Sequence, residues 1–132
     1  MLFRSFASLF VNGNISATGS VTAFAPSDIQ FKQNVADIQN ALESVINIGG
    51  KTFDWTDEYI AANGGLHDYF MHKQDFGVIA QDVQKVFPLA VRVKPDNSLA
   101  VDYQKLCALA FAAIKELKLE VDTMKAYFKN IK

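Results

Sequence analysis

The chain contains very little cysteine, proline, histidine or uncompensated charge. Cys107 is the only cysteine, which excludes an intrachain disulfide and a cysteine-rich metal site. The 13 Lys and Arg residues are balanced by 14 Asp and Glu residues, so the chain lacks the electrostatic footprint of a protein that binds nucleic acid or an anionic membrane. The two histidines, His67 and His72, have no third ligand at metal spacing. We therefore predict no metal, no cofactor and no nucleic-acid partner.

A long hydrophobic run is also missing. Residues 1–10 contain Arg4 among scattered Leu and Phe, so their apolar run is interrupted too soon to span a membrane and is short for a signal peptide. We therefore predict no membrane partner. We interpret these residues as the cut edge of a longer chain or as a short stub.

The chain is rich in apolar residues. Half of its 132 residues are hydrophobic, and Phe alone occurs 11 times, which argues against disorder and for a buried core. The length fits one domain with an appendage. We predict a leader at residues 1–26 and a domain at residues 27–132.

The leader has the pattern of thin β-structure. Between Val11 and Phe24, five apolar residues fall at odd positions with Asn, Ser and Thr between them, and glycines mark turns. Such short strands cannot make a core by themselves, but they become stable when several chains wrap around each other. The alternative is a flexible linker.

The domain alternates short helices and strands. Its apolar spacing, its glycines and its prolines mark the boundaries of these elements. We expect an amphipathic helix from about Asn34 to Asn47 that Gly49 ends, a strand at 51–55, an irregular polar segment at 56–75, a strand from Phe76, a helix at about 80–87, and a hairpin of strands 91–93 and 99–101.

The last third of the chain predicts a long helix with a heptad seam. Apolar residues recur there in alternating steps of three and four, and charged residues occupy the rest of the surface. One interpretation is a helix that lies on its own core, and the other is a coiled coil between copies. We favour self-association, because little chain follows that could cover the seam. The seam consists of Cys107, Ala110, Ile114, Leu117, Val121, Met124, Phe128 and Ile131.

A possible nucleophile and a possible base stand five residues apart where the leader meets the domain. A serine alcohol attacks a carbonyl only when a base takes its proton, and a lysine does so only when neutral, as in Ser-Lys proteases. Burial beside apolar groups such as Phe31 favours a neutral Lys32. This spacing lets Ser27 and Lys32 meet only across a turn or between chains. The alternative is a polar turn in which Ser27 and Asp28 cap a helix.

The order of several motifs resembles the peptidase S74 family. The stretch SDIQFKQN is followed by NALESVINIGG, TFDW, FGVIAQDVQKVFP, VDYQKL and AIKEL. The resemblance covers about Ser27 to Leu119, and the combination of SDxxxK with GxIAQ at this separation is fairly specific. The family comprises C-terminal intramolecular chaperones of bacteriophage tail spikes and tail fibres, including those of endosialidases, and related modules of myelin regulatory factors.

The resemblance implies an α+β domain that forms a homotrimer, registers three fibre stems and then cuts itself off. It assigns Ser27 as the nucleophile, Lys32 as the base and the Pro26-Ser27 bond as the cleavage site. Asp28 and Asn34 match further polar positions of the motif. The expected setting is a phage virion precursor that is assembled in the host cytoplasm, from which the chaperone part is released.

The cleavage reaction also needs donors that hold an oxyanion. The side-chain amides of Asn34 and Gln81 are our candidates, although Gln81 could instead satisfy backbone groups of the core. The sequence departs from the family at Gln30, where Arg or Lys is usual.

Two alternative functions remain open at this stage. The first is a trimerisation domain of the same fold that never cuts itself. The second is a releasable domain of a membrane-tethered regulator, which would require a DNA-binding region upstream.

Overall fold

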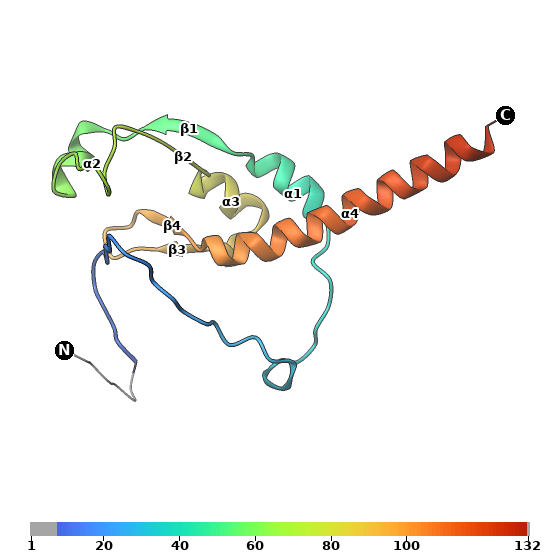
Figure 1. The fold of residues 1–132 in the computed structure, drawn as a ribbon, viewed down its shortest axis with the longest axis horizontal. Helices are drawn as coiled ribbons and strands as arrows, with labels where there is room; N and C mark the ends of the chain where they lie inside the picture. The colour runs from blue at the N-terminus through green and yellow to red at the C-terminus, as the bar shows by residue number, and fades with distance from the viewer. Residues whose placement is uncertain (1–7, 132) are drawn as a thin grey trace. The chain divides into compact units, whose positions relative to one another are not determined.

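The computed structural model describes residues 8–131, which fall into two compact units. Unit 1 contains the described residues up to Phe31 together with Trp55–Lys73. Unit 2 contains Lys32–Asp54 together with the described residues from Gln74 onward. The larger core and the long C-terminal helix both belong to unit 2 (Figure 1).

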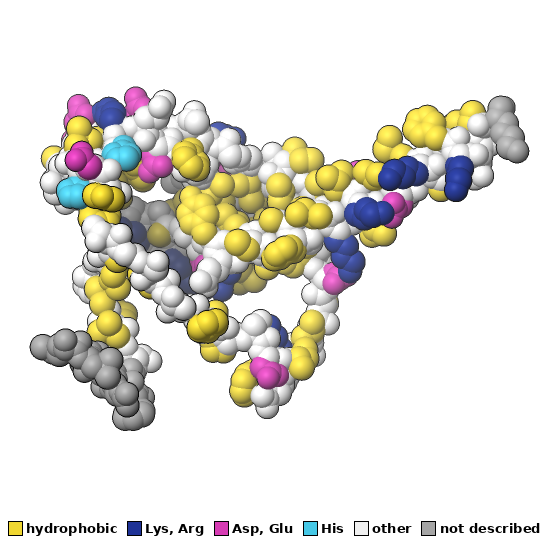
Figure 2. Space-filling model, viewed as in Figure 1, with side chains coloured by type: hydrophobic (Ala, Val, Ile, Leu, Met, Phe, Trp, Pro, Cys, Tyr) yellow, Lys and Arg dark blue, Asp and Glu magenta, His cyan; other side chains and the backbone are white. Residues whose placement is uncertain are grey.

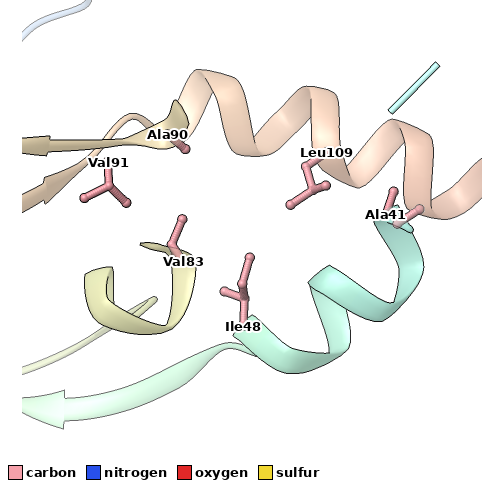
Figure 3. Packing of buried hydrophobic residues seen from close by; sticks show 7 residues of the cluster. Ala41, Ile48, Val83, Ala90, Val91 and Leu109 are labelled. Carbon is pink, nitrogen blue, oxygen red and sulfur yellow. The ribbon is translucent and has the colours of Figure 1, made fainter. Parts of the chain in front are cut away.

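The core of unit 2 lies among three helices and a short 3-10 turn. These elements are α1 (Ala41–Ile48), α3 (Ala80–Val86), α4 (Tyr103–Asn130) and η2 (Pro88–Ala90). Figure 3 shows side chains from α1, α3 and α4 pointing into one shared space. Most of them are small or β-branched, which allows the helices to approach closely. The buried cluster consists of Ala41, Ile48, Val83, Ala90, Val91, Leu109 and Ala113.

Helix α4 packs on this core through one narrow face of its N-terminal half. Its buried residues, Leu109 and Ala113, are one helical turn apart. From residue 117 onward, every described side chain is exposed except that of Val121, which is half-buried. The C-terminal half of α4 therefore extends past the core of unit 2 (Figure 1).

Replacing Leu109 by alanine is expected to destabilise the domain strongly. Leu109 is only 1% exposed, and truncation of such a leucine leaves a cavity that costs about 2–5 kcal/mol of unfolding free energy. Leu119 is on the same helix but 59% exposed, so Leu119→Ala should change that free energy by less than about 0.5 kcal/mol. Denaturant unfolding at one fixed chain concentration measures both values. Equal losses in the two variants would mean that α4 packs through a different face.

Helix α4 begins at a side-chain cap. Asp102 Oδ1 accepts hydrogen bonds from the backbone N–H groups of Gln104, at 3.0 Å, and Lys105, at 3.4 Å. Partial burial raises the pKa of Asp102, but these bonds and the charge of Lys105 outweigh it and lower the pKa from its ordinary value. The cap fixes where the long helix starts.

Two antiparallel two-stranded sheets complete unit 2. Strand β1 (Lys51–Asp54) pairs with β2 (Gln74–Gly77), and β3 (Val91–Val93) pairs with β4 (Leu99–Val101). The turn between β3 and β4 contains Asn97 with a φ of 64°, a conformation that asparagine tolerates better than most residues. The predicted hairpin and the predicted helix after β2 are confirmed to within one residue.

A close backbone approach joins β2 to the start of α4. The N–H group of Val78 donates to Tyr103 Oη at 3.3 Å. A Cβ atom on Gly77 would lie only 2.8 Å from that oxygen. Glycine at this position therefore leaves room for the tyrosine hydroxyl.

Helix α1 begins later than the sequence predicts. The expected helix at residues 34–47 is wrong at its N-terminus, because Asn40 has a left-handed φ of 53° and the helix starts at Ala41. A carboxylate from α4 supplies the cap: Glu116 accepts the N–H groups of Ala41 and Leu42 at 3.0 and 2.6 Å. The spacing of apolar residues around residues 34–47 contains no information about a cap that comes from a residue so distant in the sequence.

Helix α1 ends where the sequence predicts. Gly49 has a φ of 60°, and its N–H group donates to the carbonyl oxygen of Val45 at 2.9 Å. Lys51 Nζ donates to the carbonyl oxygen of Ile48 at 3.3 Å. A glycine in the left-handed region and a cation together complete the C-terminus of the helix.

Unit 1 contains a helix in the segment that was expected to be irregular. Helix α2 (Asp57–Ala62) is capped at its N-terminus by Thr56, whose hydroxyl oxygen accepts the Tyr59 N–H at 3.1 Å. The ring of Trp55 stacks on that of Tyr59 with centroids 4.3 Å apart. The prediction of an irregular segment at residues 56–75 is therefore wrong for α2, and it is also wrong for Gln74 and Asp75, which begin strand β2 before the expected start at Phe76.

The described part of the leader, residues 8–26, contains no strand in the single chain. Within unit 1, Asn14 Nδ2 donates to Asn63 Oδ1 at 3.2 Å. The predicted stem requires several chains wound together, so it stays a prediction, and its first seven residues lie outside the described part.

The fold class is confirmed in its coarse form. The chain is mixed α and β, with short helices, short strands and a long C-terminal helix. The coiled coil between three chains stays a prediction. None of the helices between residues 8 and 131 combines the length and the apolarity needed to cross a bilayer.

Candidate functional site

The predicted cleavage site is exposed and lies outside helix and strand, just before a turn in unit 1. Pro26 and Ser27 are exposed and precede the 3-10 turn η1 (Ile29–Phe31). Asp28 shapes this turn: its Oδ1 accepts the Gln30 N–H at 2.9 Å, and its carbonyl oxygen accepts the Phe31 N–H at 3.1 Å. The Asp28 side chain therefore acts on the backbone that follows the predicted nucleophile.

The predicted base lies in a segment of unit 2 that is neither helix nor strand. Residues 32–40, which we call the connecting segment, link Lys32 to α1. Lys32 and Asn34 are exposed, and Asn34 has a φ of 53°. The expected burial of Lys32 beside Phe31 is wrong for the single chain, in which Phe31 is itself 75% exposed. A left-handed residue two positions after Lys32 turns the backbone sharply there.

The end of the connecting segment is fixed to α4 by groups that the sequence did not reveal. Lys115 Nζ lies 2.7 Å from Asp37 Oδ2, next to the Glu116 cap on α1. Ile38 is half-buried and packs against the core. The groups of this anchor border an open pocket of about 190 Å³, whose lining consists of Asp37, Ile38, Gln39, Ala112, Lys115, Glu116 and Leu119.

The remaining candidate donor, Gln81, is exposed on the first turn of α3. Its side chain therefore does not serve the buried core, which was the alternative role for this residue. Ser27 and Asp28 belong to unit 1, whereas Lys32, Asn34 and Gln81 belong to unit 2. The pairing of Ser27 with Lys32 stays a prediction.

The predicted seam lies on a face of α4 that the core of unit 2 leaves uncovered. Met124 is 57% exposed and Phe128 is 63% exposed. Figure 2 shows hydrophobic side chains along α4, with lysines among them towards its C-terminal end. The other exposed seam residues are Cys107, Ala110, Ile114, Leu117 and Ile131, and Val121 is half-buried.

The two histidines both belong to unit 1. Residues 8–131 contain no group of three His, Cys, Asp or Glu side chains placed to hold an ion. His67 stacks on Phe70 with centroids 4.9 Å apart, and His72 Nε2 lies 2.8 Å from the carbonyl oxygen of Asp68. Both histidines therefore make local contacts within unit 1.

Comparison with known proteins adds a family and several relatives. The family model Peptidase S74, described as the chaperone of endosialidase, matches residues 27–92. The long tail fiber protein Gp37 of Enterobacteria phage K3 is 31% identical over 124 residues, which cover 89% of this chain and 9% of that protein. Gp37 of Enterobacteria phage Ox2 is 31% identical over 121 residues, which cover 89% of this chain and 43% of that protein. Myelin gene regulatory factor-like A of Dictyostelium discoideum is 29% identical, with 89% of this chain and 13% of that protein covered. The chain thus spans less than half the length of each of these relatives.

Proposed function

We propose, since the chain belongs to the Peptidase S74 family of endosialidase chaperones, that it is the assembly domain of a longer phage tail-fibre protein. In this proposal, three copies associate through the α4 seam and bring three fibre stems into register. The domain then cuts itself from the stem between Pro26 and Ser27. The likeness to tail fiber proteins at 31% identity supports a fibre as the context, and a regulator of Dictyostelium discoideum that matches the same 89% of the chain at 29% identity is the second candidate.

The observation that carries the assembly role is the uncovered apolar seam of α4. The single chain satisfies its own core with Leu109 and Ala113, which lie on a different face of the helix from the seam. A row of apolar residues at heptad spacing on an exposed face is typical of a helix that packs against copies of itself. The seam therefore supports self-association instead of packing within one chain.

The physical reason for such a domain lies in the stem that it would serve. Strands that pair between separate chains form slowly and expose unpaired edges. A helical bundle with mostly local contacts forms faster, and it raises the effective concentration of the attached stems. Removal of the bundle afterwards leaves the finished stem kinetically trapped, because the element that made assembly reversible is gone.

Self-cleavage would follow the serine mechanism at one peptide bond. Neutral Lys32 takes the proton from Ser27 Oγ, and the oxygen attacks the carbonyl carbon of Pro26. The bond to the Ser27 nitrogen breaks, that nitrogen receives the proton from Lys32, and an ester links Pro26 to Ser27 Oγ. Water hydrolyses the ester. Amides such as those of Asn34 and Gln81 would hold the oxyanion.

Intact-mass measurement of the purified chain tests both parts of the proposal. We expect a product that begins at Ser27 and lacks the first 26 of the 132 residues. Light scattering of the same sample should give three times the mass of one chain. A trimer of full-length chains would instead identify a trimerisation domain that does not cut. A monomer would overturn the assembly role as well.

A further inference from the structure

The connecting segment is the part of unit 2 with the least structure of its own. Residues 32–40 form neither helix nor strand, and Ile38 is the half-buried residue among them. Asn34 and Asn40 both have a φ of 53°. A stretch of this kind has many accessible conformations unless its ends are held. Whatever fixes its C-terminal end therefore also limits where Lys32 can go.

That end is held by two adjacent side chains of α4. Glu116 Oε1 accepts the Ala41 N–H at 3.0 Å, and Glu116 Oε2 accepts the Leu42 N–H at 2.6 Å. Lys115 Nζ lies 2.7 Å from Asp37 Oδ2. The first N–H groups of a helix have no partner within it, and a carboxylate at this end also lies favourably in the helix dipole.

Of the two contacts, that of Glu116 is the stronger. The side chains of Lys115 and Asp37 are 63% and 72% exposed, so solvent and salt screen their attraction. Glu116 is half-buried, and its two hydrogen bonds are charge-assisted. Loss of Glu116 would leave two backbone donors of α1 unsatisfied.

Glu116 also occupies the turn where α4 leaves the core of unit 2. Ala113, one turn earlier, is the last buried residue of the helix, and the next residue, Leu117, belongs to the seam. The remaining residues of α4 form a short helical stretch, and isolated helices of such length are marginal in water. Packing of the seam against other copies would therefore stabilise the turn that carries Glu116.

From these contacts we propose that Glu116, assisted by Lys115, is a positioning residue for self-cleavage. It holds the connecting segment on α4 and so limits where Lys32 can lie. This inference rests on the proposed function. Asp37 is five residues from Lys32, so the anchor keeps the Lys32 backbone within about 18 Å of the Asp37 backbone.

The kinetic test compares Glu116→Ala and Glu116→Gln with Glu120→Gln in the full chain. Glu120 is exposed one turn further along the same helix and serves as the matched control. We expect Glu116→Ala to slow the appearance of the shortened product by about tenfold or more, as loss of a charged cap with two bonds suggests. Glu116→Gln preserves volume and one acceptor oxygen, so an intermediate rate is expected. Glu120→Gln should cleave like the wild type with the same trimer mass.

Hydrogen exchange of the Ala41 and Leu42 amides reports on the anchor without any cleavage. In an uncut Ser27→Ala background, Glu116→Ala should accelerate exchange at these two amides by about tenfold, while helix content and trimer mass are kept. Unchanged exchange would overturn the anchor. Faster exchange with wild-type cleavage would overturn the positioning role and leave the proposed function standing. An uncut wild-type chain would defeat the proposed cleavage itself.

If Glu116→Ala disturbs assembly, Glu116→Gln decides the matter. A Glu116→Gln trimer that cleaves at the wild-type rate would overturn the proposal. A Glu116→Gln trimer that cleaves more slowly supports it, because a purely structural role would not separate cleavage from assembly.

Discussion

A Ser27→Ala chain is expected to remain at its full length of 132 residues while it folds and assembles like the wild type. Alanine offers no oxygen that could attack the Pro26 carbonyl, and loss of the nucleophile in serine proteases lowers the rate roughly 10⁴-fold or more. Ser27 is exposed and lies outside helix and strand, so the substitution should not alter the core. Intact mass followed over time gives the rate. A Ser27→Ala product that still begins at residue 27 would exclude Ser27 as the nucleophile.

Substitutions of Lys32 separate the role of a base from that of a charge. Lys32→Ala should block cleavage, and so should Lys32→Arg, because arginine keeps the positive charge but does not deprotonate in proteins. Ser20→Ala in the leader and Lys85→Ala on α3 are matched controls at exposed positions. Both controls should cleave normally. An active Lys32→Arg chain would show that Lys32 contributes charge instead of accepting a proton.

Aspartate at Met124 or Phe128 is expected to convert the proposed trimer into a monomer. Both side chains are more than half exposed in the single chain, so the core of unit 2 should tolerate the change. In the trimer, three carboxylates would meet at the axis, where burial of an unpaired ion costs several kcal/mol. The dissociation constant should therefore rise by at least about 10³-fold. Sedimentation equilibrium measures this change directly.

Ala126→Asp provides the matched control for the seam. Ala126 lies in the same part of α4 and is exposed, but it is not a seam residue. It should leave the trimer intact. If Met124→Asp and Ala126→Asp chains assembled equally well, the heptad pattern would not mark the contact surface. If assembly positions Lys32, the Met124→Asp monomer should also lose cleavage.

Elements with strong local signals were predictable from the sequence. The turn residues between β3 and β4 fixed that hairpin, and Pro88 marked the end of α3. The heptad spacing predicted α4, and the structure shows how its two interpretations fit together. The helix lies on its own core through Leu109 and Ala113, and it presents the seam on another face. The spacing of apolar residues shows which faces of a helix are apolar, but it does not show which of these faces the core of the same chain covers.

The start of α1 could not be predicted, because its cap is not local. The acceptor for its first N–H groups is Glu116, which is 75 residues from Ala41. Apolar residues upstream of Asn40 continue the helical spacing, so the helix was predicted to start at about Asn34. Helix α2 is a different case, because Thr56 followed by two acidic residues is a recognisable N-terminal cap, which local sequence alone suffices to predict.

The candidate site shows the same division between local and distant information. The motif around Ser27 is contiguous and can be read directly from the sequence. The anchor that fixes the far end of the connecting segment joins Asp37 to Lys115, 78 positions later. Such a pair becomes visible only when the helices have packed, because charged residues at either position also fit a solvated surface.

A ribosome makes the chain from its N-terminus, so the separation of Ala41 and Glu116 in the sequence is also a delay in time. Glu116 is added 75 residues after Ala41, which takes about 4–15 s at ordinary rates of translation. During that interval the nascent chain already carries Ser27 and Lys32 but cannot yet hold the lysine in place. If the domain cuts itself as proposed, translation would delay the cut until α4 has been synthesised.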